Sequence, residues 1–190
     1  DAEPDTIREI GRAALAARAP ADAVMPRNVA VVLKSRRWPA EALHVTCVDA
    51  YTGERCVITR SHGVPITRAV AASSAVPGLF TPQPILDRRC MDGGVSGSGT
   101  HLDLLAGARR AVVLNLTDGA GAERGAMTSG PGSFLDELAA LEGTGTKVFQ
   151  RQPETVDLLT LMDPAAVPDA VAMGQRQATA DVTELRSFLA

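Results

Sequence analysis

The segment from residue 71 to residue 94 constrains the fold of this chain more than any other. It reads AASSAVPGLFTPQPILDRRCMDGG, in which Val76-Pro77-Gly78 ends a helix and Asp92-Gly93-Gly94 forms a tight turn. Proline cannot continue a helix, and glycine allows the backbone to bend sharply and approach a partner group closely. The pattern therefore predicts that Asp92 presents its carboxylate into a site rather than into solvent.

Helical and strand-like segments alternate along the chain. Helices are expected over residues 5–19, 65–76, 102–108, 134–141 and 163–189, the last broken near Pro168. Strands are expected over residues 43–48, 55–59, 111–116, 147–150 and 156–161, and residues 29–33 suit either a strand or a helix. The run at 111–116 is apolar except for Asn115, which predicts a buried strand, whereas the Gly- and Ser-rich residues 117–132 predict a mobile loop. This alternation predicts an α/β fold, a three-layer sandwich with a mostly parallel central sheet.

Composition excludes several function classes. With 190 residues and 45% hydrophobic content, the chain suits one domain spanning residues 1–190. A net charge of −3 with scattered Lys and Arg gives no basis for nucleic-acid binding. No apolar run approaches the roughly 18 residues of a membrane span. Because the sequence starts at Asp1 without an initiator Met or a signal-peptide core, we expect an N-terminus further upstream or a processed product, and a cytoplasmic location is favoured.

The cysteines and histidines predict neither a metal site nor a catalytic triad. The chain has three of each: Cys47, Cys56, Cys90, His44, His62 and His101. An odd number of cysteines without metal-ligand spacing argues against a disulfide framework, so Cys47 and Cys56 are interpreted as small core residues. No pair of histidines has the i, i+4 spacing of a metal-binding helix, and we expect them at the surface or the edge of the core.

In combination and order, the motifs resemble the patatin-like phospholipase family. The likeness is most specific over residues 71–94, where the helix with its A-S-x-A-x-P-G signature precedes the D-G-G turn. It extends over residues 43–53 (LHVTCVDAYTG) and 106–116 (AGARRAVVLNL) and weakens after Asp118. The sequence looks closest to the compact bacterial members of the family.

The resemblance implies that Asp92 is one half of a Ser–Asp catalytic dyad. In such a dyad the carboxylate is the general base for the serine hydroxyl, with no histidine between them, and burial should raise its pKa. Gly93 and Gly94 would form the supporting turn. The family likeness implies no metal and no cofactor, a phospholipid, lysophospholipid or other acyl ester as substrate, and transient contact with a membrane surface. Asp-Gly is also a common turn pair, so a purely structural role of Asp92 is the simpler alternative.

The serine of the dyad is missing from the sequence. Neither a G-x-S-x-G nucleophile elbow nor the family's Gly-rich oxyanion loop occurs in these residues. We therefore expect a single patatin-like domain that lacks its N-terminal part, with the nucleophile upstream, on another chain or lost. Ser96 and Ser98 follow a turn with the wrong spacing, and Ser73 and Ser74 lie inside a helix, so none of the four is expected to replace it.

Two other functions are compatible with the same sequence. A protein that kept the fold and lost the nucleophile would be a non-catalytic lipid-binding or regulatory protein. The Gly-rich loops also suggest a nucleotide-binding α/β module, but the required phosphate-binding loop after a strand is not present in the sequence. The sequence assigns no substrate-binding residue.

Overall fold

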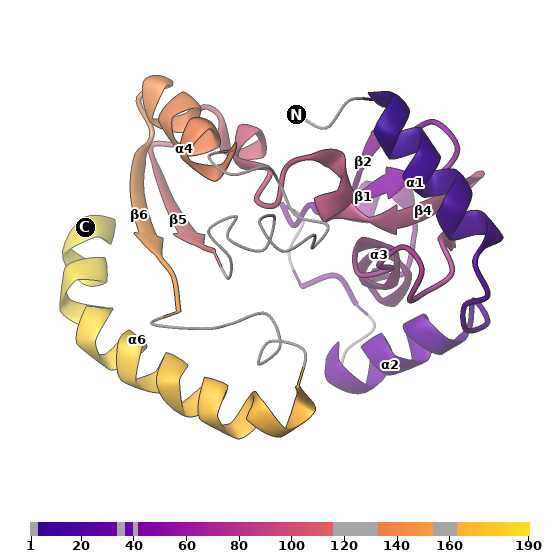
Figure 1. The fold of residues 1–190 in the computed structure, drawn as a ribbon. Helices are drawn as coiled ribbons and strands as arrows, with labels where there is room; N and C mark the ends of the chain where they lie inside the picture. The colour runs from indigo at the N-terminus through magenta and orange to yellow at the C-terminus, as the bar shows by residue number, and fades with distance from the viewer. Residues whose placement is uncertain (1–3, 34–36, 40–41, 116–132, 154–162) are drawn as a thin grey trace. The chain divides into compact units, whose positions relative to one another are not determined.

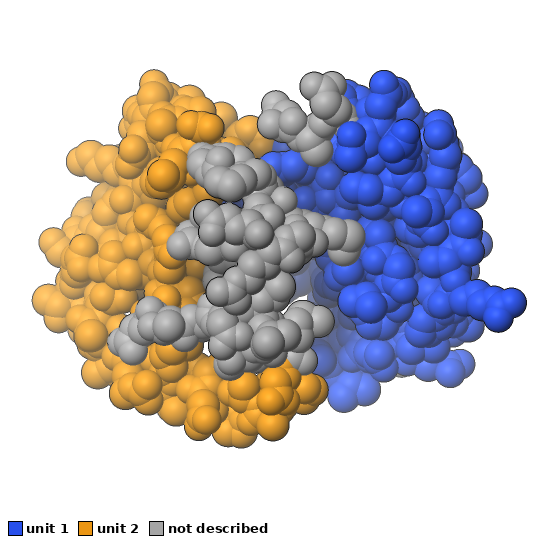
Figure 2. Space-filling view, viewed as in Figure 1, with its two compact units in different colours: residues 1–101, 127–133 blue, residues 102–126, 134–190 orange. Residues whose placement is uncertain are grey.

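The computed structural model describes residues 4–33, 37–39, 42–115, 133–153 and 163–190. The chain divides into two compact units, residues 1–101 with 127–133 (unit 1) and residues 102–126 with 134–190 (unit 2), coloured separately in Figure 2. Each unit has its own sheet (Figure 1), so each is described by itself. The loop expected at 117–132 and the strand expected at 156–161 lie outside the described residues.

Unit 1 is built on a four-stranded sheet with the strand order β2-β1-β4-β3. The strands are Val45–Asp49 (β1), Arg55–Ile58 (β2), Gln83–Ile85 (β3) and Arg88–Asp92 (β4). The hairpin predicted between residues 43 and 59 is confirmed, since β1 and β2 pair directly across a turn closed by a hydrogen bond from the Gly53 N–H to the Asp49 carbonyl (2.8 Å).

The mixed α/β class is confirmed, but the prediction of a mostly parallel sheet is wrong for this sheet. All three pairings, β1 with β2, β1 with β4 and β3 with β4, are antiparallel. The connections explain the difference, because β1–β2 and β3–β4 are joined by short turns, and parallel neighbours need crossovers of a dozen or more residues. Leu86 lies in the β3–β4 turn with a left-handed φ of 53°. Only β5 and β6 of unit 2 form a parallel pair in the described part of the chain.

Helices pack on both faces of the unit 1 sheet (Figure 1). Helix α1 (Pro4–Ala16) buries Ile7 and Ala14 against one face, where Val48 and Met91 are fully buried. Helix α3 (Ile66–Ser73) covers the opposite face, and α2 (Val24–Leu33) contacts α3. Residues 29–33, ambiguous in sequence, are therefore helical. Apolar residues at helical spacing explain α1 and α3, and α3 ends before Pro77 as predicted.

Unit 2 is built on β5 (Arg110–Leu114) and β6 (Lys147–Arg151), with α4 (Ser133–Gly143) and α6 (Val167–Leu189). The short 3₁₀ helix η3 (Leu102–Leu105) lies where a short helix was expected. The core of the unit joins η3, β5 and α4 and consists of Leu102, Ala111, Val113, Phe134 and Leu141. The predicted strand at 147–150 is confirmed as β6.

Two details of unit 2 differ from the sequence expectations. Strand β5 is not buried on both faces, because Val112 and Leu114 are 41% and 75% exposed while Ala111 and Val113 are buried. The expected break near Pro168 is absent: the described helix α6 is continuous after the 3₁₀ turn Pro164–Ala166 (η5), and its proline lies in the first turn. A first-turn proline removes no intrahelical hydrogen bond, which is why the helix tolerates it. Among the described helices, none has the length and apolarity required to cross a bilayer.

Candidate functional site

Asp92 lies where the sheet of unit 1 meets the segment that follows α3. It is the last residue of β4, paired with Cys47 of β1, and it is the N-cap of the 3₁₀ helix η2 (Gly93–Ser96). Its backbone N–H donates to the carbonyl of Ala75 (3.0 Å), directly after α3. The helix, its stop and the turn that were recognised in sequence therefore meet at one point, with Asp92 at the junction.

The turn after Asp92 admits only glycine at its first position. A Cβ placed on Gly93 would lie 2.7 Å from the carbonyl oxygen of Thr46 and 2.8 Å from its Oγ1. Separations this short do not occur for real side chains, so the β1 backbone occupies the space that any other residue would need. Gly93 is thus required by close approach of two backbones, which fixes the position of Asp92 relative to β1.

The Asp92 carboxylate is held by one backbone donor. Its Oδ1 accepts a hydrogen bond from the Gly94 N–H (2.9 Å), and within the described part of the chain Oδ2 has no protein partner. The side chain is half-buried, and burial raises its pKa above the ordinary value of 3.8, although the Gly94 hydrogen bond opposes the shift. A carboxylate that is fixed at one oxygen and is more basic than usual is suited to accept a proton at the other.

The glycine- and serine-rich segment after the turn is ordered by its own hydroxyl groups. Ser98 N–H donates to Ser96 Oγ (3.4 Å), and the Ser98 Oγ accepts from the His101 N–H (2.7 Å). His101 is buried with a left-handed φ of 52°, and its Nδ1 lies 3.4 Å from Nη1 of Arg55. Ser96 and Ser98 therefore shape this turn, a role that differs from that of a nucleophile.

The other sequence candidates lie apart from this arrangement. Ser73 ends α3 and Ser74 follows it, both half-buried. His44 and His62 are exposed, as expected for surface positions, and none of the contacts described for Asp92 involves a histidine. Among the residues that the structure describes, the Asp92 carboxylate therefore has no imidazole partner.

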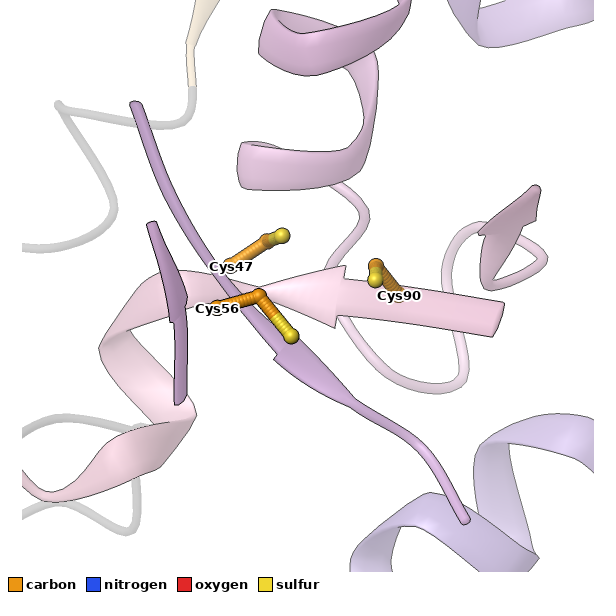
Figure 3. Close-up of side chains that lie close together, drawn as sticks. All are labelled: Cys47, Cys56 and Cys90. Atoms are coloured by element: carbon orange, nitrogen blue, oxygen red, sulfur yellow. The ribbon is translucent and has the colours of Figure 1, made fainter. Parts of the chain in front are cut away.

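Cys47, Cys56 and Cys90 form a cluster that the sequence did not predict. The three sulfur atoms lie within 4.8 Å of one another, all three side chains are buried, and none is in a disulfide (Figure 3). The predicted hairpin already contained part of this signal, because its turn aligns Cys47 opposite Cys56. Cys90 joins them through the pairing of β1 with β4, which connects segments far apart in the chain and left no local trace in the sequence.

The three thiols of the cysteine cluster differ in pKa. Hydrogen bonds from the Cys47 and Cys90 thiols, assisted by Arg88, lower the pKa of Cys56. The same contact raises the pKa of Cys47, because its thiol is the donor. Nη1 of Arg88 donates to the Cys56 sulfur at 3.4 Å, and the sulfur also lies 3.8 Å from the Glu54 carbonyl oxygen. Cys56 is therefore the thiol of the three that most readily becomes a thiolate.

Unit 2 contains an apolar pocket between its strands and α6. Its volume is about 880 Å³, and its lining includes Val112 and Leu114 of β5, Phe149 of β6, and Met173 and Leu185 of α6. The pocket explains why β5 is apolar on its exposed face. Arg151 holds α6 near the strands through ion pairs with Asp181 (2.8 Å) and Glu184. A pocket of this size and lining suits an apolar ligand.

The family model described as "Patatin-like phospholipase" matches residues 5–105, just over half of the chain. The matched range includes the segment 71–94 and the Asp92 turn. No curated protein matches the chain.

Proposed function

Because the chain belongs to the patatin-like phospholipase family, we propose that it is the aspartate-bearing part of a serine hydrolase that cleaves lipid acyl esters. The family match confirms the resemblance recognised in the motifs and indicates hydrolase chemistry in lipid metabolism. The observation that carries the proposal of Asp92 as the base is the geometry of its turn. Gly93 allows the chain to approach β1 closely, and the Asp92 carboxylate keeps one oxygen available because only Oδ1 accepts a hydrogen bond in the described part of the chain.

In the proposed reaction, Asp92 is the general base and a serine outside these 190 residues is the nucleophile. The carboxylate takes the hydroxyl proton as the serine oxygen attacks the ester carbonyl carbon, and the alcohol leaves with that proton. Water then attacks the acyl-enzyme, giving its proton to Asp92, and the fatty acid leaves as the serine regains a proton. The alcohol thus carries away the original serine proton, the serine regains one from water, and Asp92 ends as a carboxylate, so the cycle needs only substrate and water.

The apolar pocket of unit 2 supports a lipid ligand independently of the Asp92 turn. Burial of each methylene group contributes about 0.8 kcal/mol, so a long acyl chain inside the pocket would gain several kcal/mol toward binding. The lining is mostly apolar, and of its two arginines, Arg151 and Arg176, the first is already paired with Asp181 and Glu184, so the pocket favours the lipid class over a nucleotide. We infer that the substrate is an ester of a long acyl chain that reaches a membrane surface only transiently.

The test is hydrolysis of a long-chain ester by the full-length protein and its Asp92→Asn variant. Loss of a general base should lower kcat/KM by about 10²- to 10⁴-fold. Asp87→Asn is the matched control, because this substitution makes the same chemical change at an exposed position in the β3–β4 turn. Equal activity of wild type and Asp92→Asn would overturn the assignment of Asp92.

A non-catalytic lipid-binding or regulatory protein of the same fold is the alternative, since the pocket alone would serve it. The same experiment separates the two functions, because this alternative predicts binding of the ester without turnover in the wild-type protein. Hydrolysis that persists in EDTA and depends on Asp92 favours the enzyme, and binding without hydrolysis favours the alternative.

A further inference from the structure

The cysteine cluster of unit 1 is a feature that acyl-ester hydrolysis does not use. Cys47, Cys56 and Cys90 come from the three adjacent strands β1, β2 and β4, and they face the same side of the sheet, toward α3. Figure 3 shows the three side chains gathered where these strands run side by side. The backbone positions are set by strand pairing, so the sulfurs are held together before any ligand arrives.

We propose that these three cysteines form a binding site for a soft metal ion, namely three-coordinate Cu(I). Metal–sulfur bonds of about 2.3 Å in a trigonal arrangement separate the sulfur atoms by about 4 Å. The observed separations are all within 4.8 Å, so adjustments of about 1 Å or less would bring all three sulfurs into bonding distance.

Burial determines the coordination number. Cys47 and Cys90 are 0% exposed and Cys56 is 9% exposed, so little solvent reaches the sulfur atoms, and no other Cys, His, Asp or Glu joins the group among the described residues. Zinc is almost always four-coordinate in structural sites, and oxygen-preferring ions do not select thiolates. Soft thiolate ligands without a fourth donor favour Cu(I).

The charge around the cluster favours a thiolate site over a simple core of small apolar residues. Thiols packed only for volume need no cation, yet the Arg88 guanidinium donates to the Cys56 sulfur at 3.4 Å. The same group lies 3.6 Å from the buried carboxylate of Asp49, so it offsets negative charge from both. Binding of Cu(I) would release the thiol protons to solvent, and Arg88 would stabilise the thiolates that remain on the metal.

The experiment is an anaerobic titration of the reduced, purified protein with Cu(I) in competition with a chromophoric chelator. We expect one Cu(I) per chain, with X-ray absorption showing three sulfur scatterers in the wild-type protein. Cys56→Ser should weaken binding by more than about 100-fold, and Arg88→Met, which removes a supporting contact, by about 10- to 100-fold. Val48→Ala is the control, since Val48 is fully buried on the opposite face of the sheet and should leave the affinity unchanged.

Other outcomes would overturn the proposal. Equal Cu(I) binding by the variant with all three cysteines changed to serine would place the metal elsewhere, and absence of binding by the wild type would mean that the thiols only pack. Tight Zn(II) binding with a nitrogen or oxygen scatterer beside the sulfurs would contradict the three-coordinate site. Because the absorption measurement uses wild-type protein, the test stands even where a cysteine variant does not fold.

Discussion

The two units differ in how closely their backbones approach neighbouring atoms. In unit 1, a Cβ on Gly11 would overlap the carbonyl oxygen of Ala50, and one on Gly93 would clash with Thr46. In unit 2, a Cβ on Gly143 or Gly174 would meet no atom within 4 Å. Gly11 and Gly93 therefore allow close backbone contacts in unit 1, whereas Gly143 and Gly174 of unit 2, like Gly63 and Gly78 of unit 1, lie in uncrowded positions.

This contrast separates two requirements of a lipid hydrolase. The proposed general base, Asp92, must be held in a fixed position, and the close contact of Gly93 with β1 fixes its backbone. The proposed site for an acyl chain must have unfilled apolar volume, and the pocket between α6 and the strands of unit 2 has such volume. We infer that unit 1 supplies the fixed position of Asp92 and that unit 2 supplies the volume for an apolar ligand.

The largest expected effect on stability comes from adding one methyl group in each unit. Gly93→Ala should lower the free energy of unfolding by about 1–3 kcal/mol, because the β1 backbone must move to accommodate the new Cβ. Gly174→Ala, in the interior of α6, should raise it by about 1 kcal/mol, because alanine favours the helix and meets no atom. Urea denaturation measures both, and changes of the same sign would remove the contrast.

A substitution that fills the pocket of unit 2 tests whether its open volume binds a ligand. Gly174 lines the pocket, so Gly174→Leu should occupy the volume of several methylene groups and weaken binding of a fluorescent long-chain fatty acid by roughly 10- to 100-fold. Gly143→Leu adds the same side chain at another uncrowded helix position that does not line the pocket, and it should leave the affinity unchanged. Equal losses in both variants would mean that the pocket is not the binding site.

The smallest expected effect is the pH dependence of stability at Asp92. Burial raises the native pKa of this carboxyl above 3.8, so the folded state binds the proton more tightly than the unfolded state does. Stability should therefore fall as pH rises from 3.8 through the native pKa, where the buried group ionises. Asp92→Asn removes this loss, so the variant should gain stability relative to wild type with rising pH in that interval. If thermal unfolding gave the same pH dependence of stability for wild type and Asp92→Asn, the raised pKa of Asp92 would be contradicted.

Local signals in the sequence predicted much of unit 1 and the candidate base. The Asp49–Gly53 turn, the proline after α3 and the Asp92-Gly93-Gly94 run each act within a few residues, and the structure places each element where these signals indicate. The role of Asp92 stays a prediction, although its raised pKa and its turn are as expected for it.

Long-range contacts were beyond the sequence. The antiparallel pairing of β1 with β4 joins segments about forty residues apart, and without it neither the strand directions nor the approach of Cys90 to Cys47 could be deduced. In unit 2, Val112 and Leu114 suggested a buried strand, because the sequence does not distinguish an apolar residue that lines a pocket from one that is buried in a core.

The most direct test of the central claim is labelling of the full-length protein with a fluorophosphonate serine probe, followed by peptide mapping. We expect one adduct, on a serine outside the 190 residues printed here, formed more slowly in Asp92→Asn than in Asp87→Asn. An adduct on Ser96 or Ser98, or a labelling rate that is the same in both variants, would contradict the account of Asp92 as the base of a Ser–Asp dyad.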